Sequence, residues 1–309
     1  MVPLPSPQQL RYLVALAETR HFGRAALACT VTQSTLSAGI LTLESQLGAS
    51  ILDRTAGKNV VFTPLGLELV ERARDALAAL LAVTEAVDAA RAPMSGPLRI
   101  GVIPTIGPFL LPRLMPALRQ AFPRLRPWLR EDTTARLVDR LGSSKLDVVL
   151  VALPCDCGGA DTVTLARDEF LVALPPGHRL AELESVPPGA LATERLLLLE
   201  EGHCLREQAL AVCGLLAGDR GETLDSFAAT SLHTLVQMVA SGLGVTLLPR
   251  LAICAGVAAG TELVLRPLAG GGAQRMLGLA WRPKAPRAAE YRALGSKLAQ
   301  VCAALLDEG

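Results

Sequence analysis

The segment 63–93 constrains the fold most, because it predicts one long helix. Thr63-Pro64 supplies a capping hydroxyl and then a proline at the first helical position, and no glycine or proline follows Gly66 until Pro93. Apolar residues recur along it at alternating spacings of four and three, at Leu69, Ala73, Ala76, Leu80, Val83 and Val87. This heptad seam predicts that the helix pairs with a second copy of itself. An ordinary amphipathic helix packed on its own domain is the alternative.

The residues before this helix, 1–62, predict three short helices followed by a wing. Apolar spacing places the helices up to about Glu18, from Gly23 to Ala28, and from Gln33 to about Gln46. Two helices separated by a tight turn form the helix-turn-helix layout. The segments 51–54 and 60–63 then predict a small hairpin, or wing, joined across a glycine.

Short polar side chains gather at the start of the third helix, where they suit base edges and phosphates. In the wing, Arg54 and Lys58 are predicted to touch the DNA backbone or the minor groove. The candidate DNA-binding residues are Thr32, Gln33, Ser34, Thr35, Ser37 and Arg54. Residues 1–60 carry five Lys/Arg against three Asp/Glu, so this small surplus predicts that two or more half-sites must be bound together.

After a hinge at Pro93, Gly96 and Pro97, the sequence pattern changes to one typical of alternating strands and helices. Strands are predicted over 98–103, 126–131 and 146–153, with amphipathic helices between them. This βαβαβ order predicts a mostly parallel sheet with helices on both faces. Residues 97–309 are therefore expected to form an α/β regulatory region after an α-rich winged helix-turn-helix domain.

The composition excludes several other classes of protein. The net charge is +1 and charged residues make up 19% of the chain, so any DNA-binding surface must be local. No signal peptide, uncharged membrane-spanning run, phosphate-binding loop or nucleophile elbow is evident. We therefore expect a cytoplasmic protein that is not an enzyme and needs no cofactor, with most of its seven cysteines reduced.

The segment HFGRAALACTVTQSTLSAGILTLESQLGASILDR resembles the signature of LysR-type transcriptional regulators. The resemblance covers essentially the whole chain. It implies a winged helix-turn-helix, a long dimerising helix and a regulatory region of two subdomains similar to periplasmic binding proteins. It also implies binding to promoter half-sites on double-stranded DNA, assembly into dimers and tetramers, and contact with RNA polymerase. One departure is Leu52, where many LysR proteins have an aromatic residue.

Within that family the chain most resembles the hydrogen-peroxide sensors of the OxyR group. The resemblance rests on three segments: MSGPLRIGVIPTIGPFLLP, EGHCLREQALAVC and ATSLHTLVQMVASGLGVTLLP. It implies a peroxide-reactive Cys204, a resolving Cys213, and control of oxidative-stress genes by the reversible disulfide between them. The peroxide pocket that it implies consists of Thr105, Thr134, His203 and Arg275.

The spacing of the two thiols determines whether a disulfide between them can form without a change of conformation. If the stretch from Cys204 to Cys213 is helical, nine residues advance about 13.5 Å and rotate about 180°. A disulfide needs Cα atoms within roughly 7 Å, so the bond cannot form without unwinding the segment. Next to Cys204, His203, Arg206 and the helix N-terminus are expected to favour the thiolate.

Other interpretations of these residues stay open at this point. Thr105 and Ser231 could each cap a helix, and His203 could pack locally. Cys29, Cys254 and Cys302 read as inert apolar residues, and the CDC at 155–157 has no role in the resemblance; a metal site there would need further ligands, and no metal is expected. A LysR protein that responds to a small organic effector is the alternative function, and a thiol peroxidase with a DNA-binding head is a rival from another class.

Overall fold

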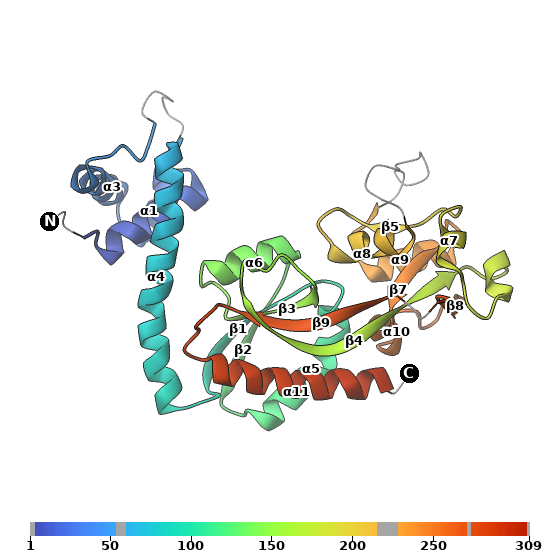
Figure 1. The fold of residues 1–309 in the computed structure, drawn as a ribbon. Coiled ribbons are helices and arrows are strands. Elements are labelled where there is room, and N and C mark those ends of the chain that lie inside the picture. The colour runs from blue at the N-terminus through green and yellow to red at the C-terminus, as the bar shows by residue number, and fades with distance from the viewer. Residues whose placement is uncertain (1–3, 54–59, 215–227, 271–272, 308–309) are drawn as a thin grey trace. The chain divides into compact units, whose positions relative to one another are not determined.

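The computed structural model describes residues 4–53, 60–214, 228–270 and 273–307 (Figure 1). The chain divides into two compact units, Met1–Asp88 and Ala89–Gly309. Among the described residues, no single helix is long and apolar enough to cross a membrane, and only the pair α2 and α3, bent by 99°, matches by length and composition.

The first unit contains the predicted helices in the predicted order. Their bounds are α1 (Pro7–Thr19), α2 (Phe22–Ala28), α3 (Gln33–Leu47) and α4 (Pro64–Arg91). A capping box at Ser6 and Gln9 starts α1, and the Thr32 side chain accepts a hydrogen bond from the Thr35 N–H at the start of α3. Leu36, Ile40 and Leu43 are buried on the inner face of α3, as their spacing predicts.

The wing is held to α3 by a buried carboxylate. Leu52 and Phe62 form an antiparallel bridge. Glu44 Oε1 accepts hydrogen bonds from the backbone N–H groups of Ile51 (2.8 Å) and Leu52 (3.1 Å). Gly66 passes so close to the Ile51 carbonyl that a Cβ there would lie 2.2 Å from its oxygen. These contacts fix the base of the wing against both α3 and α4.

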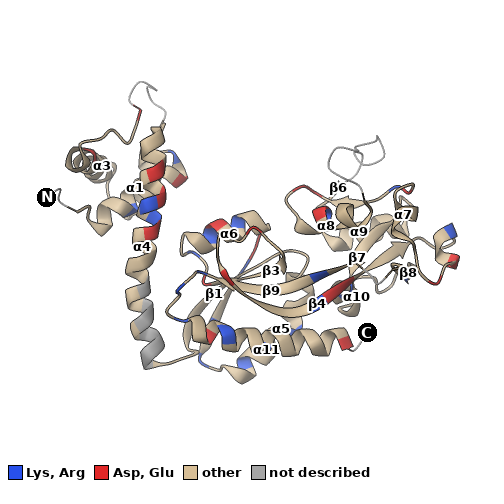
Figure 2. Cartoon of the chain, viewed as in Figure 1, with Lys and Arg blue, Asp and Glu red and all other residues tan. Residues whose placement is uncertain are grey.

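The heptad seam on α4 becomes more exposed along the helix. Ala73 is buried, whereas Leu80, Val83 and Val87 are 47%, 65% and 45% exposed. Near its N-terminal end, acidic and basic residues alternate along the helix (Figure 2). Among the described residues of the first unit, these three seam side chains are left about half exposed.

The second unit is built on a twisted sheet with the strand order β2-β1-β3-β9-β4-β7, and β8 pairs with β4 off this path. The strands of this sheet are β1 (Gly96–Val102), β2 (Leu125–Glu131), β3 (Val148–Leu153), β4 (Asp161–Leu174), β7 (Thr246–Pro249), β8 (Val264–Pro267) and β9 (Gln274–Trp281). A second, two-stranded sheet pairs β5 (Leu198–Leu199) with β6 (Ala228–Ala229).

The expectation of a mostly parallel sheet is correct only for β2, β1 and β3. Those three strands pair in parallel, but β9 runs antiparallel between β3 and β4, and β7 and β8 are antiparallel to β4. The late strand returns from the end of the chain into the middle of the sheet, so crossover helices do not set its direction.

Strand β4 joins two halves of the regulatory unit. Its first part pairs with β9, and its last residues, Phe170–Leu174, pair with β7 and β8. The apolar segment 169–174 thus forms only the last part of this long strand. Two α/β subdomains share this strand.

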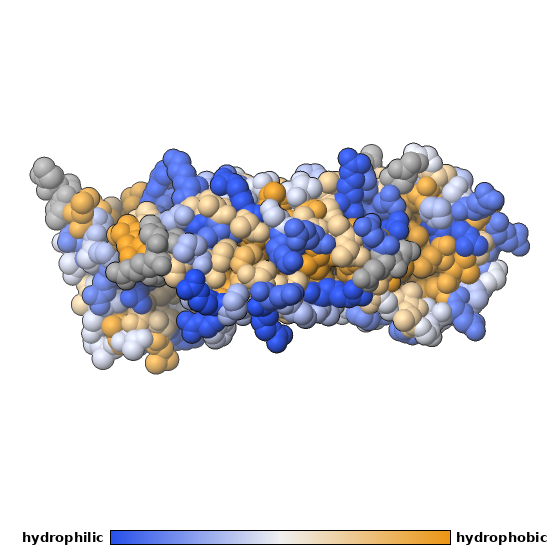
Figure 3. Space-filling view, turned by 90° about the horizontal axis from the view of Figure 1, so that it is seen from below, coloured by the Kyte–Doolittle hydropathy of each residue, from blue (hydrophilic) through white to orange (hydrophobic). Residues whose placement is uncertain are grey.

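Helices cover both faces of the sheet, as predicted. They are α5 (Gly107–Ala121), α6 (Thr134–Gly142), the 3-10 helix η2 (Arg179–Glu182), α7 (Pro188–Leu191), α8 (Cys204–Val212), α9 (Leu232–Ala240), α10 (Arg250–Cys254) and α11 (Ala288–Asp307). Helix α11 packs against β4 and α5, and α6 lies on the opposite face of the sheet (Figure 1). Seen from below, hydrophilic residues separate the hydrophobic ones over much of the surface (Figure 3).

Candidate redox site

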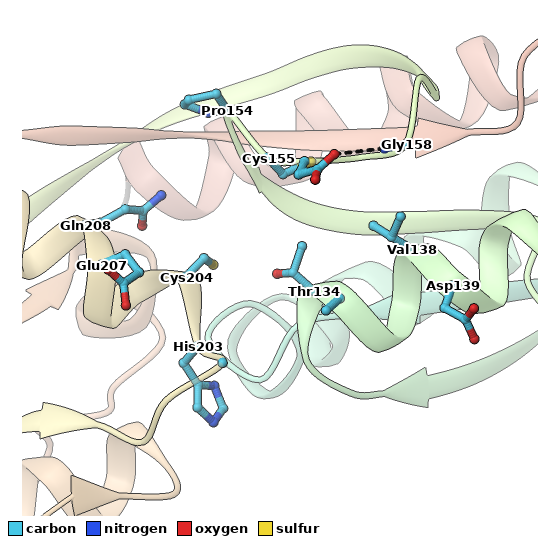
Figure 4. A pocket seen from close by; sticks show the side chains of 13 residues that line it. Thr134, Val138, Asp139, Pro154, Cys155, Gly158, His203, Cys204, Glu207 and Gln208 are labelled. Carbon is cyan, nitrogen blue, oxygen red and sulfur yellow. Dashed lines mark hydrogen bonds between the residues drawn. The ribbon is translucent and has the colours of Figure 1, made fainter. Parts of the chain in front are cut away.

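A cleft of about 700 Å³ opens in the regulatory unit between α6, α8 and the loop that follows β3 (Figure 4). Side chains from three separate segments face it. Its lining includes Thr134, Val138, Asp139, Pro154, Cys155, Asp156, His203, Cys204, Glu207 and Gln208. The cleft therefore brings together Cys204, the predicted reactive cysteine, and Thr134, one of the two threonines predicted for the peroxide pocket.

Cys204 is the first residue of α8 and is half-buried on the cleft. His203 stands at the N-cap without a side-chain capping hydrogen bond. The Arg206 guanidinium donates to the Leu199 carbonyl at 3.2 Å, so this contact ties α8 to β5. The N-terminal, positive end of the α8 dipole lies at Cys204.

Cys213 lies at the other end of the same helix, at its C-cap. It is 5% exposed, and burial raises the pKa of its thiol to about 11. The segment between the two thiols is helical, which is the condition under which their spacing prevents a disulfide without unwinding. In this state Cys213 is a buried, protonated thiol away from the cleft.

A buried ion pair between Arg275 and Asp168 holds Thr105, one of the residues of the predicted peroxide pocket. Arg275 on β9 is opposite Asp168 on β4, and its Nε donates to Asp168 Oδ2 at 2.9 Å. Its Nη1 and Nη2 donate to Thr105 Oγ1 (2.8 Å) and to the Thr105 carbonyl (3.0 Å). Both ionic side chains are 0% exposed. Arg275 thus fixes Thr105, and it does not itself line the cleft.

A small cavity, too narrow to admit a water molecule in this conformation, shares four lining residues with the cleft and contains most of the predicted peroxide-pocket residues. Its lining comes from the turn after β1, the start of α6 and the start of α8, namely Ile103, Pro104, Thr105, Thr133, Thr134, Gly202, His203 and Cys204. Thr105, Thr134 and His203 therefore meet Cys204 in one place, whereas Arg275 and Cys213 stand outside it.

Two polar atoms on the cleft are buried without a hydrogen-bond partner: Thr134 Oγ1 and Gln208 Oε1. A buried polar atom without a partner is costly, and a small hydrogen-bonding ligand would satisfy both. Gln208 and Asp168 are the site residues that the sequence reasoning missed. Gln208 lies four positions after Cys204, and that spacing could have placed it on the same helical face; Asp168 carried no local signal.

Of the two residues that could instead be helix caps, Ser231 is one and Thr105 is not. Thr105 does not cap α5, whose N-cap is Ile106, because its hydroxyl bonds Arg275 instead. Ser231 does cap α9, since its Oγ accepts from the Thr234 N–H at 3.2 Å.

The remaining cysteines differ from one another. Cys155 and Cys157 form a disulfide with Cα atoms 5.3 Å apart, and no group of metal ligands is found among the described residues. Cys302 is fully buried, and burial raises its pKa to about 12. Cys29 and Cys254 are half-buried, so the expectation of a core position for Cys29 is met only in part.

The start of α3 presents the predicted DNA-contacting residues. Thr32, Gln33, Ser34 and Thr35 are exposed, and Ser37 is half-buried. The Thr32 hydroxyl lies 2.9 Å from that of Ser34 and 2.8 Å from that of Thr35, which organises the first turn. Arg54 and Lys58 lie outside the described residues.

A winged helix-turn-helix followed by a long helix and a two-lobed α/β unit with an open cleft defines a DNA-binding transcriptional regulator. Residues 7–67 match the model of the bacterial regulatory helix-turn-helix protein, lysR family, and residues 91–303 match that of the LysR substrate binding domain. The chain belongs to the LysR family of transcriptional regulators.

Individual relatives agree with this assignment. The chain is 44% identical over 291 residues, 94% of each protein, to the DNA-binding transcriptional dual regulator OxyR of Escherichia coli (strain K12). It is 42% identical to a probable hydrogen peroxide-inducible genes activator of Streptomyces viridosporus, over 95% of this chain and 93% of the relative. A full-length OxyR variant from Pseudomonas aeruginosa matches in structure with a TM-score of 0.72 and 34% identity, covering 96% and 98% of the two chains.

Hydrogen peroxide is the ligand named for a solved relative. A Corynebacterium glutamicum OxyR variant with bound hydrogen peroxide matches with a TM-score of 0.67 and 30% identity, covering 100% of this chain and 96% of that one.

Proposed function

We propose that this chain is a peroxide-responsive transcriptional regulator that is switched by a reversible Cys204–Cys213 disulfide. The observation that carries the proposal is the placement of these two thiols at opposite ends of α8. One faces a cleft with unpartnered polar atoms, and the other is buried. The similarity to the named OxyR proteins supports hydrogen peroxide as the signal.

The chemistry begins at Cys204. Its thiolate attacks one peroxide oxygen, the O–O bond breaks, and the other oxygen leaves as hydroxide, which takes a proton to become water. Thr134 Oγ1 can donate a hydrogen bond to that oxygen, and Gln208 can bond the peroxide from α8. Thr105, held by Arg275, fixes the opposite side of the small cavity. These groups position peroxide and stabilise the departing charge.

The second step requires α8 to unwind. Cys213 attacks the sulfur of the Cys204 sulfenic acid, an S–S bond forms, and water leaves. Helical geometry separates the two Cα atoms by about 13.5 Å. The buried Cys213 thiol stays protonated, because burial raises its pKa to about 11. Unwinding both closes the distance and returns the thiol to water, where more of it ionises. Oxidation therefore requires a change of fold in the regulatory unit.

Each protein molecule reacts once for each signal. Cellular thiols must then reduce the disulfide, so the protein acts in the cytoplasm as a sensor and not as a peroxidase. In this proposal residues 1–62 bind DNA, 63–93 dimerise and 97–309 sense the oxidant.

The heptad seam supports pairing with a second copy. In the first unit an apolar groove of about 680 Å³ runs along α4, lined by leucines and alanines from α1, α3 and α4. The exposed Leu80 and Val83 lie on its edge. We propose that the helices of two chains cover this surface, and that further pairing of regulatory units gives a tetramer whose half-site spacing changes on oxidation and alters contact with RNA polymerase.

A footprint on a promoter fragment tests the function. Reduced protein and protein treated with excess peroxide, enough to oxidise both cysteine pairs, should protect regions of different length, because the two states space their half-site contacts differently. The matched control is Cys254→Ser, which alters another half-buried cysteine and should keep the shift. Identical footprints in the two states would contradict the proposed function, as would a shift that survives in Cys204→Ser.

A further inference from the structure

A second cysteine pair faces the reactive cysteine across the same cleft. Cys155 lies in the loop between β3 and β4 and lines the cleft together with Cys204 (Figure 4). Its neighbour Cys157 is within disulfide reach of it, and the two are joined. One cysteine of each pair, Cys155 of 155/157 and Cys204 of 204/213, therefore lines the cleft.

The two pairs make different demands on the fold. Cys213 is buried at the far end of α8 and can reach Cys204 only if the helix unwinds. Cys155 and Cys157 are both half-buried and lie in a loop outside helices and strands. Cys155 already borders the space into which Cys204 faces.

Few hydrogen bonds hold this loop. Gly158 and Gly159 both adopt positive φ angles, 59° and 76°, which make a tight turn that glycine tolerates at low cost. Within the loop, the Ala160 N–H donates to the Cys157 carbonyl at 3.1 Å, and Asp156 accepts a longer hydrogen bond of 3.5 Å from the Gly158 N–H. Cys155 and Cys157 pack against the regulatory core only in part. Moving Cys155 toward Cys204 therefore breaks fewer backbone hydrogen bonds than unwinding α8, in which each turn is hydrogen-bonded to the next.

We infer that Cys155 and Cys157 form a second redox site, which takes the oxidising equivalent from Cys204 in competition with Cys213. The inference rests on the proposed function, because Cys204 must first be oxidised by peroxide. The Cys155 sulfur attacks the sulfur of the Cys204 sulfenic acid, a Cys155–Cys204 disulfide forms, and water leaves. The Cys157 thiolate then attacks the Cys155 sulfur and releases the Cys204 thiolate.

The two steps together transfer the oxidation from Cys204 to the 155/157 pair. One sulfenic acid and two thiols become one disulfide, one thiol and one water, so Cys204 is regenerated while 155–157 is oxidised. Helix α8 stays intact because Cys213 takes no part. The geometry allows this combination: Cys155 and Cys157 lie within disulfide reach, with Cα atoms 5.3 Å apart, while Cys204 and Cys213 stand at the two ends of a formed helix. A reduced 155/157 pair then consumes the first peroxide, and the switch responds fully only after that pair is oxidised.

The transfer is tested in fully reduced full-length protein given one equivalent of peroxide, then alkylated and mapped as peptides without reduction. In Cys213→Ser, the peroxide equivalent should appear as a 155–157 disulfide. Adding Cys157→Ser should stop the reaction at the first step, and a Cys155–Cys204 linked peptide should accumulate. The matched control adds Cys155→Ser as well, which should leave Cys204 as a sulfenic acid that dimedone labels.

Each result has one meaning. A linked Cys155–Cys204 peptide together with loss of dimedone labelling supports the second redox site. Equal dimedone labelling of Cys204 with and without Cys155 overturns the inference and leaves the proposed function standing. A Cys204 that is never labelled or crosslinked in any variant overturns the proposed function and this inference with it. Because Cys213→Ser alone leaves the loop unaltered, its 155–157 result does not depend on the loop variants folding.

Discussion

The two sides of the cleft are held in very different ways. On one side, Thr105 is fixed by a fully buried Arg275, whose partner Asp168 also accepts the Leu251 N–H at 2.8 Å. On the other side, α8 has only Leu205 and Ala209 among its nine residues buried. One side is tied into the central sheet, and the other is a short amphipathic helix.

The difference shows how one site can both bind and respond. A small ligand needs hydrogen-bonding groups at fixed positions, and the Arg275 network supplies one of them. A switch needs an element whose alternative state costs little. Because the reactive thiol begins the weakly held helix, the proposed oxidation of Cys204 couples peroxide bound against the fixed side to unwinding of α8.

The largest effect is expected at the first reacting atom. Cys204→Ser removes the only cysteine that lines the small cavity among the described residues, so the fast reaction with peroxide should fall to the rate of an ordinary thiol. The rate is measured by stopped-flow loss of peroxide in reduced protein. Cys254→Ser is the matched control, and a fast reaction that survives in Cys204→Ser would refute the assignment of the reactive cysteine.

The fixed side can be weakened at its anchor. Arg275→Met leaves Asp168 buried without its ionic partner, and breaking a buried pair in this way costs about 3–5 kcal/mol of stability. Urea denaturation of reduced protein measures the loss. The exposed Arg126→Met should change the stability little. A loss below about 1 kcal/mol would show that the network does not anchor this side.

The weak side carries a pH dependence. Burial raises the pKa of Cys213 from 9.0 to about 11, so the unfolded thiol ionises first as pH rises. The stability from this group is complete below pH 9, and it is lost between pH 9 and about 11. Relative to Cys213→Ala, the wild type should lose about 2 kcal/mol more across this window, in urea titrations under reducing conditions. Equal losses in the two proteins would contradict the buried position of Cys213.

A smaller effect is expected from the unpartnered hydroxyl. Thr134→Val keeps the shape but removes an Oγ1 that has no protein partner, so stability should hold while oxidation of Cys204 slows. One lost hydrogen bond to the peroxide corresponds to about a tenfold lower rate. The exposed Thr164→Val should leave the rate unchanged. A stability loss without a rate change would assign Thr134 to packing.

Local sequence signals predicted the elements that depend on local physics. The Thr63-Pro64 start of α4 follows from capping, with the Thr63 hydroxyl accepting from the Gly66 N–H. The helix that begins at Cys204, which was assumed for the spacing argument, is present although its N-cap residue makes no capping hydrogen bond. The direction of β9 could not be predicted, because its pairing with β3 and β4 joins segments more than a hundred residues apart. The Asp168–Arg275 pair was missed for the same reason, since it exists only once those strands meet.

The most direct test of the central claim is peptide mapping of reduced protein after one equivalent of hydrogen peroxide, in a Cys155→Ser/Cys157→Ser background that removes the competing pair. The account predicts a Cys204–Cys213 linked peptide, absent when Cys204 is also replaced by serine. Free thiols at both positions after the peroxide is consumed would contradict it, because oxidation would then leave α8 helical and the two sides of the cleft unchanged.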